Sequence, residues 1–277
     1  MEPPKYVYFS FLLFLGYTIY VLYASEDYYS TIDANARDEV LKKQLKSLIS
    51  DHKNIPYNDV WQAFADIFKS MASYPCDDDP TTIPDIYSAF CWAPEKKKEG
   101  GECGIWKNEG DCFNREHIWP KSWFGGFEKG KGAQTDLFEL YPSDGKVNTM
   151  RSNLPLGDVI DSEVTYESSN GSRIGRCSSK LFNGKCFEVA PSLKGDIARS
   201  YFYLSVAYEN EWDCCDEEGV SRSSIKPWME AELRKWHKQD PVDDYERKRN
   251  DVIFKNWQGN RNPFIDHPEW VYQIADF

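Results

Sequence analysis

Histidine is scarce in this chain of 277 residues, and the cysteines lack the spacing of a metal cluster. The four histidines are His52, His117, His237 and His267. A zinc site with three imidazoles would need nearly all of them from scattered segments. The eight cysteines contain no paired CxxC pattern, and their even number favours disulfides over a zinc ribbon.

Basic residues are outnumbered, with 33 Lys and Arg against 45 Asp and Glu, for a net charge of -12. Affinity for a phosphate backbone normally comes from Lys and Arg that displace counterions, so composition alone does not suggest a nucleic-acid partner. The charge is uneven, however. Residues 171–194 are locally basic, with one acid, Glu188, against Arg173, Arg176, Lys180, Lys185 and Lys194. This segment is either a cationic strip or an ordinary solvated face.

The only long apolar run lies at the N-terminus, from Tyr6 to Ala24, after Lys5 and before a polar stretch that opens at Ser25. Such a segment directs a chain to the secretory pathway. Its length leaves two alternatives open, a cleaved signal peptide over residues 1–24 or an uncleaved membrane anchor. We therefore expect a secreted, extracellular or periplasmic protein, which contacts a membrane only if residues 6–24 are retained.

Apolar residues at helical spacing predict helices over 35–50, from a cap at Asn58, over 195–210 and over 242–257. The segment 76–111 is rich in Pro, Gly and charge, which favours loops and short strands. Bonds between Cys103 and Cys112 and between Cys177 and Cys186 would close plausible short loops. Cys214 and Cys215 are expected to pair elsewhere, because a bond between neighbours would strain the peptide.

Glu116, His117 and Asn148 form the most interesting set of polar residues. Carboxylate and amide oxygens are hard ligands suited to Mg²⁺, and an imidazole can take a proton from water near neutral pH. Neighbouring residues of a regular strand point to opposite faces, so the pair 116–117 should lie at a distorted strand end. Spacing alone proves little, since a lone Glu-His pair is more often a surface carboxylate beside a hydrogen-bonded histidine.

Several ordered motifs decide between these interpretations. They are Asn114-Arg115-Glu116-His117-Ile118-Trp119-Pro120-Lys121-Ser122-Trp123, Asp136-Leu137, Tyr141-Pro142-Ser143-Asp144-Gly145-Lys146-Val147-Asn148, Arg151-Ser152-Asn153, Gly195-Asp196-Ile197-Ala198-Arg199 and Gln258-Gly259-Asn260-Arg261-Asn262-Pro263. Together they closely resemble the endonuclease I family of extracellular and periplasmic nucleases, over about Tyr57 to Val271.

The resemblance implies an α+β fold, largely helical with a small sheet, that carries a ββα-metal (His-Me finger) site and is stapled by disulfides. Residues 25–56 would be a polar helical extension, and residues 57–277 the catalytic domain. Glu116 and Asn148 would hold Mg²⁺, or another divalent cation such as Mn²⁺ or Ca²⁺. His117 would be the general base that activates water for in-line attack on phosphorus, which leaves a 5′-phosphate. The substrate would be DNA, and often RNA, cut with little sequence preference, and no stable protein partner is implied.

Candidate phosphate contacts are Arg115, Lys121, Lys146, Arg151 and Arg173, and each could instead be structural. Arg151 is balanced between supporting Asn148 and binding phosphate. Relatives commonly have His after Asp-Leu where this chain has Phe138, which is expected to change mainly packing or substrate contact. The alternative is a non-catalytic secreted binding protein that retains the fold; the presence of Glu116, His117 and Asn148 together argues against it.

Overall fold

The computed structural model describes residues 28–69, 82–92, 103, 106–125, 132–212 and 214–277. The expected signal peptide or anchor over residues 1–24 lies outside them. Within these ranges no helix is both long enough and apolar enough to cross a membrane.

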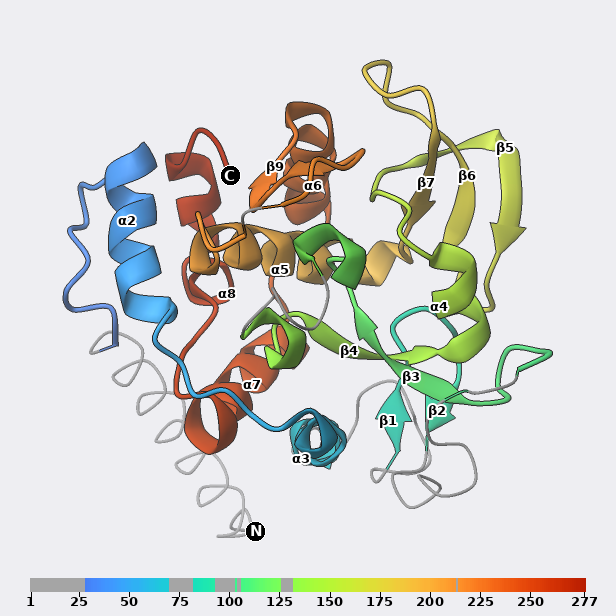
Figure 1. Cartoon of the computed structure of the whole chain (residues 1–277), viewed down its shortest axis with the longest axis horizontal. Coiled ribbons are helices and arrows are strands. Elements are labelled where there is room, and N and C mark those ends of the chain that lie inside the picture. The colour runs from blue at the N-terminus through green and yellow to red at the C-terminus, as the bar shows by residue number, and fades with distance from the viewer. Residues whose placement is uncertain (1–27, 70–81, 93–102, 104–105, 126–131, 213) are drawn as a thin grey trace, which may run out of the picture.

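A fully buried helix, α5, lies near the centre of the molecule, and α2, α6 and α8 pack against it (Figure 1). The α-helices are α2 (Asp38–Ile49), α3 (Val60–Lys69), α4 (Gly145–Arg151), α5 (Lys194–Ala207), α6 (Pro227–Gln239), α7 (Asp244–Val252) and α8 (Pro263–Asp266). A π-helix, Ile253–Trp257, continues α7, and short 3-10 segments include Tyr57–Asp59, Lys121–Phe124 and Ala133–Thr135. Every residue of α5 is buried, because α2, α6 and α8 all pack against it.

The helices predicted from periodicity are confirmed within a few residues. In α2, Leu41, Leu45 and Ile49 repeat every fourth residue and are all 1% exposed or less. They belong to the one hydrophobic core that the buried apolar residues of the described chain form. Helix α6 was not predicted.

The strands form small antiparallel sheets. They are β1 (Ile83–Pro84) with β2 (Cys91–Trp92), β3 (Phe113–His117) with β4 (Leu140–Asp144), the order β5 (Val159–Glu167), β6 (Arg173–Cys177), β7 (Lys185–Glu188), and β8 (Val220–Ser221) with β9 (Ser224–Ile225). The β3–β4 pair leads directly into α4, and the β5–β7 sheet stands beside it (Figure 1). The expected α+β class, largely helical with small sheets and disulfides, is confirmed.

Three disulfides join described residues. Cys103–Cys112 and Cys177–Cys186 form as predicted. The prediction for Cys214 and Cys215 was wrong, because their sulfurs are joined to each other. The peptide between these two residues is cis, and their Cα atoms are 3.3 Å apart.

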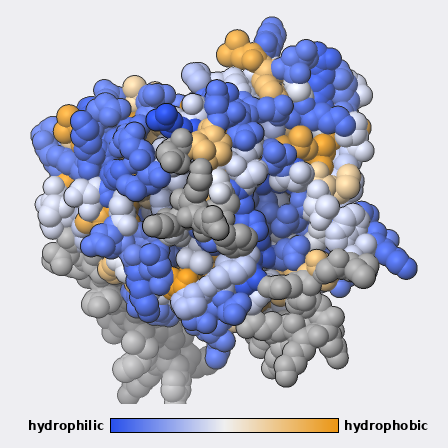
Figure 2. Space-filling view, in the orientation of Figure 1, coloured by the Kyte–Doolittle hydropathy of each residue, from blue (hydrophilic) through white to orange (hydrophobic). Residues whose placement is uncertain are grey.

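The face of the molecule seen in Figure 2 is largely hydrophilic, with hydrophobic residues in small separate groups. The large hydrophobic side chains exposed among the described residues are likewise scattered along the chain, at Val40, Phe90, Met150, Leu181 and Tyr272. Single exposed apolar residues of this kind are common on protein surfaces.

Candidate active site

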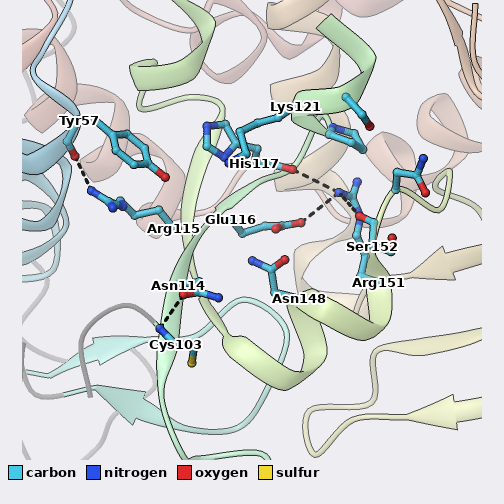
Figure 3. A pocket seen from close by; sticks show the side chains of 13 residues that line it. Tyr57, Cys103, Asn114, Arg115, Glu116, His117, Lys121, Asn148, Arg151 and Ser152 are labelled. Atoms are coloured by element: carbon cyan, nitrogen blue, oxygen red, sulfur yellow. Dashed lines mark hydrogen bonds and ion pairs between the residues drawn. The ribbon is translucent and has the colours of Figure 1, made fainter. Parts of the chain in front are cut away.

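A cavity of about 740 Å³ brings most of the predicted site residues together. Its lining comes from β3, from α4 and the turn that follows it, from the 3-10 segment after β3, and from Tyr57. The predicted residues among the lining are Arg115, Glu116, His117, Lys121, Asn148 and Arg151. Figure 3 shows that the Glu116 and Asn148 side chains face one another, while Arg115 lies on the other side of β3.

All four residues from Asn114 to His117 on β3 line the cavity, and among the described strands β3 pairs with β4 alone. His117 is the last residue of β3, so the pair 116–117 does lie at a strand end. The ladder is in continuous register through Glu116 and His117, so the expected distortion is not seen in the pairing.

The His117 ring is held in one tautomer. Its Nε2 lies 3.1 Å from the carbonyl oxygen of Gln134, and because a carbonyl can only accept, Nε2 carries the proton. Nδ1 therefore has the lone pair. The Tyr57 ring stacks nearby, with the ring centroids 6.1 Å apart. Burial, with a smaller contribution from Lys121, lowers the pKa of His117 to about 3, so the ring is neutral at physiological pH.

Glu116 is 3% exposed, and its carboxylate is held from two sides. The Tyr87 hydroxyl donates to its Oε1 at 3.1 Å, and the Arg151 Nη1 also lies 3.1 Å from Oε1. Burial raises the pKa of Glu116 to about 7, while Arg151 and Tyr87 both favour the charged form. A cation bound at this carboxylate would favour the charged form further.

Asn148 lies on α4, whose start is fixed by two features. The Asp144 side chain caps the helix by accepting hydrogen bonds from the backbone N–H groups of Lys146 and Val147. Gly145 packs directly against the Cys103–Cys112 disulfide, because a Cβ at Gly145 would lie 2.0 Å from the Cys103 sulfur. The helix that carries Asn148 is thereby fixed against the segment leading into β3.

Arg151 is a structural residue as well as part of the lining. It is 1% exposed, and its guanidinium donates to the backbone oxygens of His117 and Ile118 and pairs with Glu116. It therefore links the strand that carries the glutamate and the histidine to the helix that carries Asn148. Of the two roles predicted for Arg151, support of Asn148 and phosphate binding, these contacts favour support of the site.

The other candidate phosphate contacts lie in different places. Arg115 lies over the Tyr57 ring at 3.5 Å and donates to the Tyr57 carbonyl oxygen at 2.7 Å. Lys121 lines the cavity, and burial lowers its pKa. Lys146 and Arg173 are not among the lining residues. Arg173 lies on β6.

Two tyrosines at the site, Tyr57 and Tyr87, were not found from the sequence. Both approach it through tertiary contacts, and no motif marks them. Phe138 is completely buried, with its ring 4.7 Å from that of Tyr203, so the departure at this position affects packing. His267 bonds to Glu269 and stacks on Trp270, away from the cavity.

The oxygen donors fit a small divalent cation. Both contacts of Glu116 with described side chains end on Oε1, and the Asn148 amide lies across the same cavity. One carboxylate and one amide suit Mg²⁺, which keeps several of its waters. Within the described ranges no group of three or more His, Cys, Asp or Glu could form a closed metal cage.

Comparison with known proteins gives a consistent result. The sequence model of the family described as Endonuclease I matches residues 38–269. The chain is 34% identical to an extracellular ribonuclease of Bacillus subtilis, over 91% of this chain and 80% of the relative. It is 29% identical to Endonuclease-1 of Buchnera aphidicola, over 66% of this chain and 67% of that one. A periplasmic deoxyribonuclease of Aeromonas hydrophila is 31% identical over 47% of each chain.

Proposed function

Because the chain belongs to the endonuclease I family, we propose that it is a secreted, metal-dependent endonuclease with a ββα-metal (His-Me finger) site. It hydrolyses phosphodiester bonds of DNA and RNA with little sequence preference and leaves 5′-phosphate products. The site consists of β3, β4 and α4, which follow one another in the chain and carry Glu116, His117 and Asn148.

The observation that carries this proposal is the tautomer of His117, with Nδ1 unprotonated, in the same cavity as the oxygen atoms of Glu116 and Asn148. The hydrogen bond from Nε2 to Gln134 leaves the Nδ1 lone pair to accept a proton. A water at Nδ1 gives its proton to the ring as its oxygen attacks phosphorus, the bond from phosphorus to the 3′ oxygen breaks, and the departing 3′ oxygen takes up a proton from solvent water. Burial lowers the pKa of the ring, so Nδ1 is unprotonated at neutral pH.

Glu116 and Asn148 would hold the divalent cation, Mg²⁺ or another such as Mn²⁺ or Ca²⁺. When bound, the cation supplies positive charge that stabilises the charge developing on the phosphoryl group. Arg151 keeps the two ligands in register, since it contacts Glu116 and the backbone of β3 from the end of α4.

The choice of substrate follows from the same chemistry. The nucleophile is water, so the reaction does not need a ribose 2′-hydroxyl, and both DNA and RNA can be cut. The relatives include proteins named as ribonuclease and as deoxyribonuclease. The cations that line the cavity, Arg115 and Lys121, are placed to contact phosphate, which carries no sequence information.

We further propose that residues 57–277 are the catalytic domain, that residues 25–56 are an N-terminal extension of it, and that the apolar segment before them directs export. The relatives named as extracellular or periplasmic support this location.

A cleavage assay on two substrates tests the proposal. Purified protein should nick plasmid DNA and degrade structured RNA with Mg²⁺, and the addition of EDTA should stop both reactions. Glu116→Gln and Asn148→Ala should raise the concentration of Mg²⁺ needed for half-maximal rate. If neither substrate is cut across a series of Mg²⁺, Mn²⁺ and Ca²⁺ while nucleic acid is still retarded on a gel, the chain is a binding protein and not a nuclease.

A further inference from the structure

Tyr87 reaches Glu116 from a separate part of the chain. It lies in the loop between β1 and β2, 29 residues before the glutamate, and its side chain is completely buried. Its hydroxyl donates to Oε1 of Glu116 at 3.1 Å. Tyr87 is not among the residues that line the cavity, so it contacts the carboxylate from the protein side.

The loop that carries Tyr87 is fixed by the buried Asp85 carboxylate. Oδ1 of Asp85 accepts hydrogen bonds from the backbone N–H groups of Tyr87 at 2.7 Å and Ser88 at 2.8 Å, and Oδ2 accepts one from the Trp92 indole at 2.8 Å. Three donors on one carboxylate hold the loop in a single shape. The position of the Tyr87 backbone is therefore determined by its own hairpin.

Two further contacts fix this loop relative to the site. The backbone N–H of Ile86 donates to the carbonyl of Pro142 on β4 at 3.1 Å, and β4 is the strand paired with β3. The Tyr87 ring packs edge to face on Phe187 of β7, with the centroids 4.7 Å apart. The tyrosine hydroxyl is thus held at a set place beside the end of β3.

The two donors on Glu116 act on the same oxygen. Tyr87 approaches Oε1 from the β1–β2 loop and Arg151 approaches it from α4, both at 3.1 Å. Two donors on Oε1 restrict rotation of the carboxylate and leave Oε2 as the oxygen available to the cavity. Groups that orient a metal ligand in this way commonly change metal affinity about 10-fold to 100-fold when removed.

We propose that Tyr87 is a positioning residue for the metal ligand Glu116: its hydroxyl orients the carboxylate so that Oε2 is presented to a divalent cation. The inference rests on the proposed function, because it takes Glu116 as a ligand. It assigns the β1–β2 hairpin a purpose that the motifs around β3 and α4 do not reveal.

Direct measurement of metal binding tests this role. Mn²⁺ is added to wild-type protein and to Tyr87→Phe, and free Mn²⁺ is followed by electron paramagnetic resonance. The phenylalanine removes the hydroxyl alone, and the dissociation constant should rise by about 10-fold or more. In cleavage assays kcat at saturating Mn²⁺ should change much less than the Mn²⁺ concentration at half-maximal rate.

Tyr141→Phe is the matched control. Tyr141 is also buried and sits opposite Glu116 in the ladder, but its hydroxyl bonds to Ser200. The Tyr141→Phe variant loses one buried hydroxyl, as Tyr87→Phe does, and should keep the wild-type Mn²⁺ affinity. Asp85→Asn is an independent variant, in which an amide cannot accept from all three donors of Asp85; the loop should loosen and Mn²⁺ affinity should fall although Tyr87 is intact.

The outcomes separate the two proposals. If wild type binds Mn²⁺ and cleaves plasmid while Tyr87→Phe binds equally well, the positioning role is overturned and the nuclease proposal stands. Equal weakening in Tyr141→Phe also overturns it, since loss of any buried hydroxyl would then suffice. Wild-type protein that neither binds Mn²⁺ nor cleaves nucleic acid overturns both. If Tyr87→Phe is unfolded by circular dichroism, unchanged Mn²⁺ affinity in Asp85→Asn overturns the role.

Discussion

Two clusters of basic residues in this acidic protein have opposite surroundings. The cavity at β3 and α4 is lined by Arg115, Lys121 and Arg151 with Glu116 as the one acidic residue of the lining. On the β5–β7 sheet, the two arginines of β6 are matched by acids. Arg173 pairs with Asp161 and Glu188, both at 2.7 Å, and Arg176 lies 3.9 Å from Glu163.

The comparison shows that a run of basic residues in a sequence is a poor guide to phosphate binding. The segment 171–194 is locally basic along the chain, but its arginines Arg173 and Arg176 pair with carboxylates of β5, across the sheet. The cations of the cavity are fewer and scattered along the chain, yet they converge on one space with a single carboxylate. The local excess of positive charge, not the count, decides where a polyanion can bind.

The largest effect that separates the cavity from the rest of the molecule should come from His117→Ala. Loss of a positioned general base costs about 10²-fold to 10⁴-fold in rate. Plasmid cleavage at saturating Mg²⁺ measures the loss, and circular dichroism checks the fold. His267→Ala is the matched control, because His267 stacks on Trp270 outside the cavity. This variant should cleave plasmid at the wild-type rate. If His117→Ala cleaves plasmid at a rate within about tenfold of the wild-type rate, the ring is not the general base.

Arg151→Ala and Arg173→Ala should differ strongly in stability. Removing Arg151 leaves Glu116 buried without its cation, and breaking such a pair costs about 3–5 kcal/mol. Arg173 is partly exposed, so its loss should cost about 1 kcal/mol or less. Urea unfolding of both variants measures the difference. Equal destabilisation would mean that the pairs on the sheet are as important to the fold as the pair at the site.

Lys121→Ala should weaken substrate binding more than Arg176→Ala does. Loss of one phosphate contact reduces the slope of log affinity against log salt by about 1. The experiment titrates a short duplex in EDTA, which stops cleavage, at several salt concentrations and compares the two variants. An equal change of slope in Arg176→Ala would show that the sheet also contacts the polyanion, and the contrast between the two clusters would fail.

The smallest effect concerns the acid stability that Asp158 provides, just before β5. Burial alone would raise the pKa of Asp158, but hydrogen bonds from Lys194, Lys235 and Trp236 outweigh it and hold the pKa at about 2. Because the folded pKa lies below the unfolded one, the carboxylate stabilises the fold above about pH 4, and this contribution is lost as the pH falls toward about 2.

Asp158→Asn tests this acid dependence. The variant should be less stable than wild type at neutral pH, with a difference that shrinks through that acid range in urea titrations. Asp161→Asn is the control, since Asp161 is 90% exposed. A difference for Asp158→Asn that is independent of pH would show that its charge does not contribute.

The helical part of the fold was predictable because its apolar residues repeat at helical spacing. This rule identified α2, α3, α5 and α7. It could also have identified α6, where Met229, Leu233 and Trp236 follow the same spacing after Pro227. The β5–β7 sheet was harder, because most of β5 is exposed and its charged residues are balanced only across the strands.

The catalytic residues of the proposed site were predictable because β3, β4 and α4 are close in sequence and carry recognisable motifs. Tyr57 and Tyr87 were not, because they reach Arg115 and Glu116 across 58 and 29 residues. Arg151 could be named but not assigned, since its role depends on the carbonyl oxygens of His117 and Ile118 around it. A sequence shows which groups are present, whereas orientation of those groups depends on tertiary contacts.

The central helix α5 has a consequence for how the protein is made. All of its residues are buried. Of the helices that pack against it, α2 precedes it in the chain, and α6 and α8 follow it. During synthesis α5 leaves the ribosome before α6 and α8 exist, so its apolar side chains stay uncovered for that interval. Contacts between distant segments also form slowly. A nascent chain of this protein therefore passes through an aggregation-prone stage, and a chaperone that shields α5 until α8 emerges should raise the yield of folded protein.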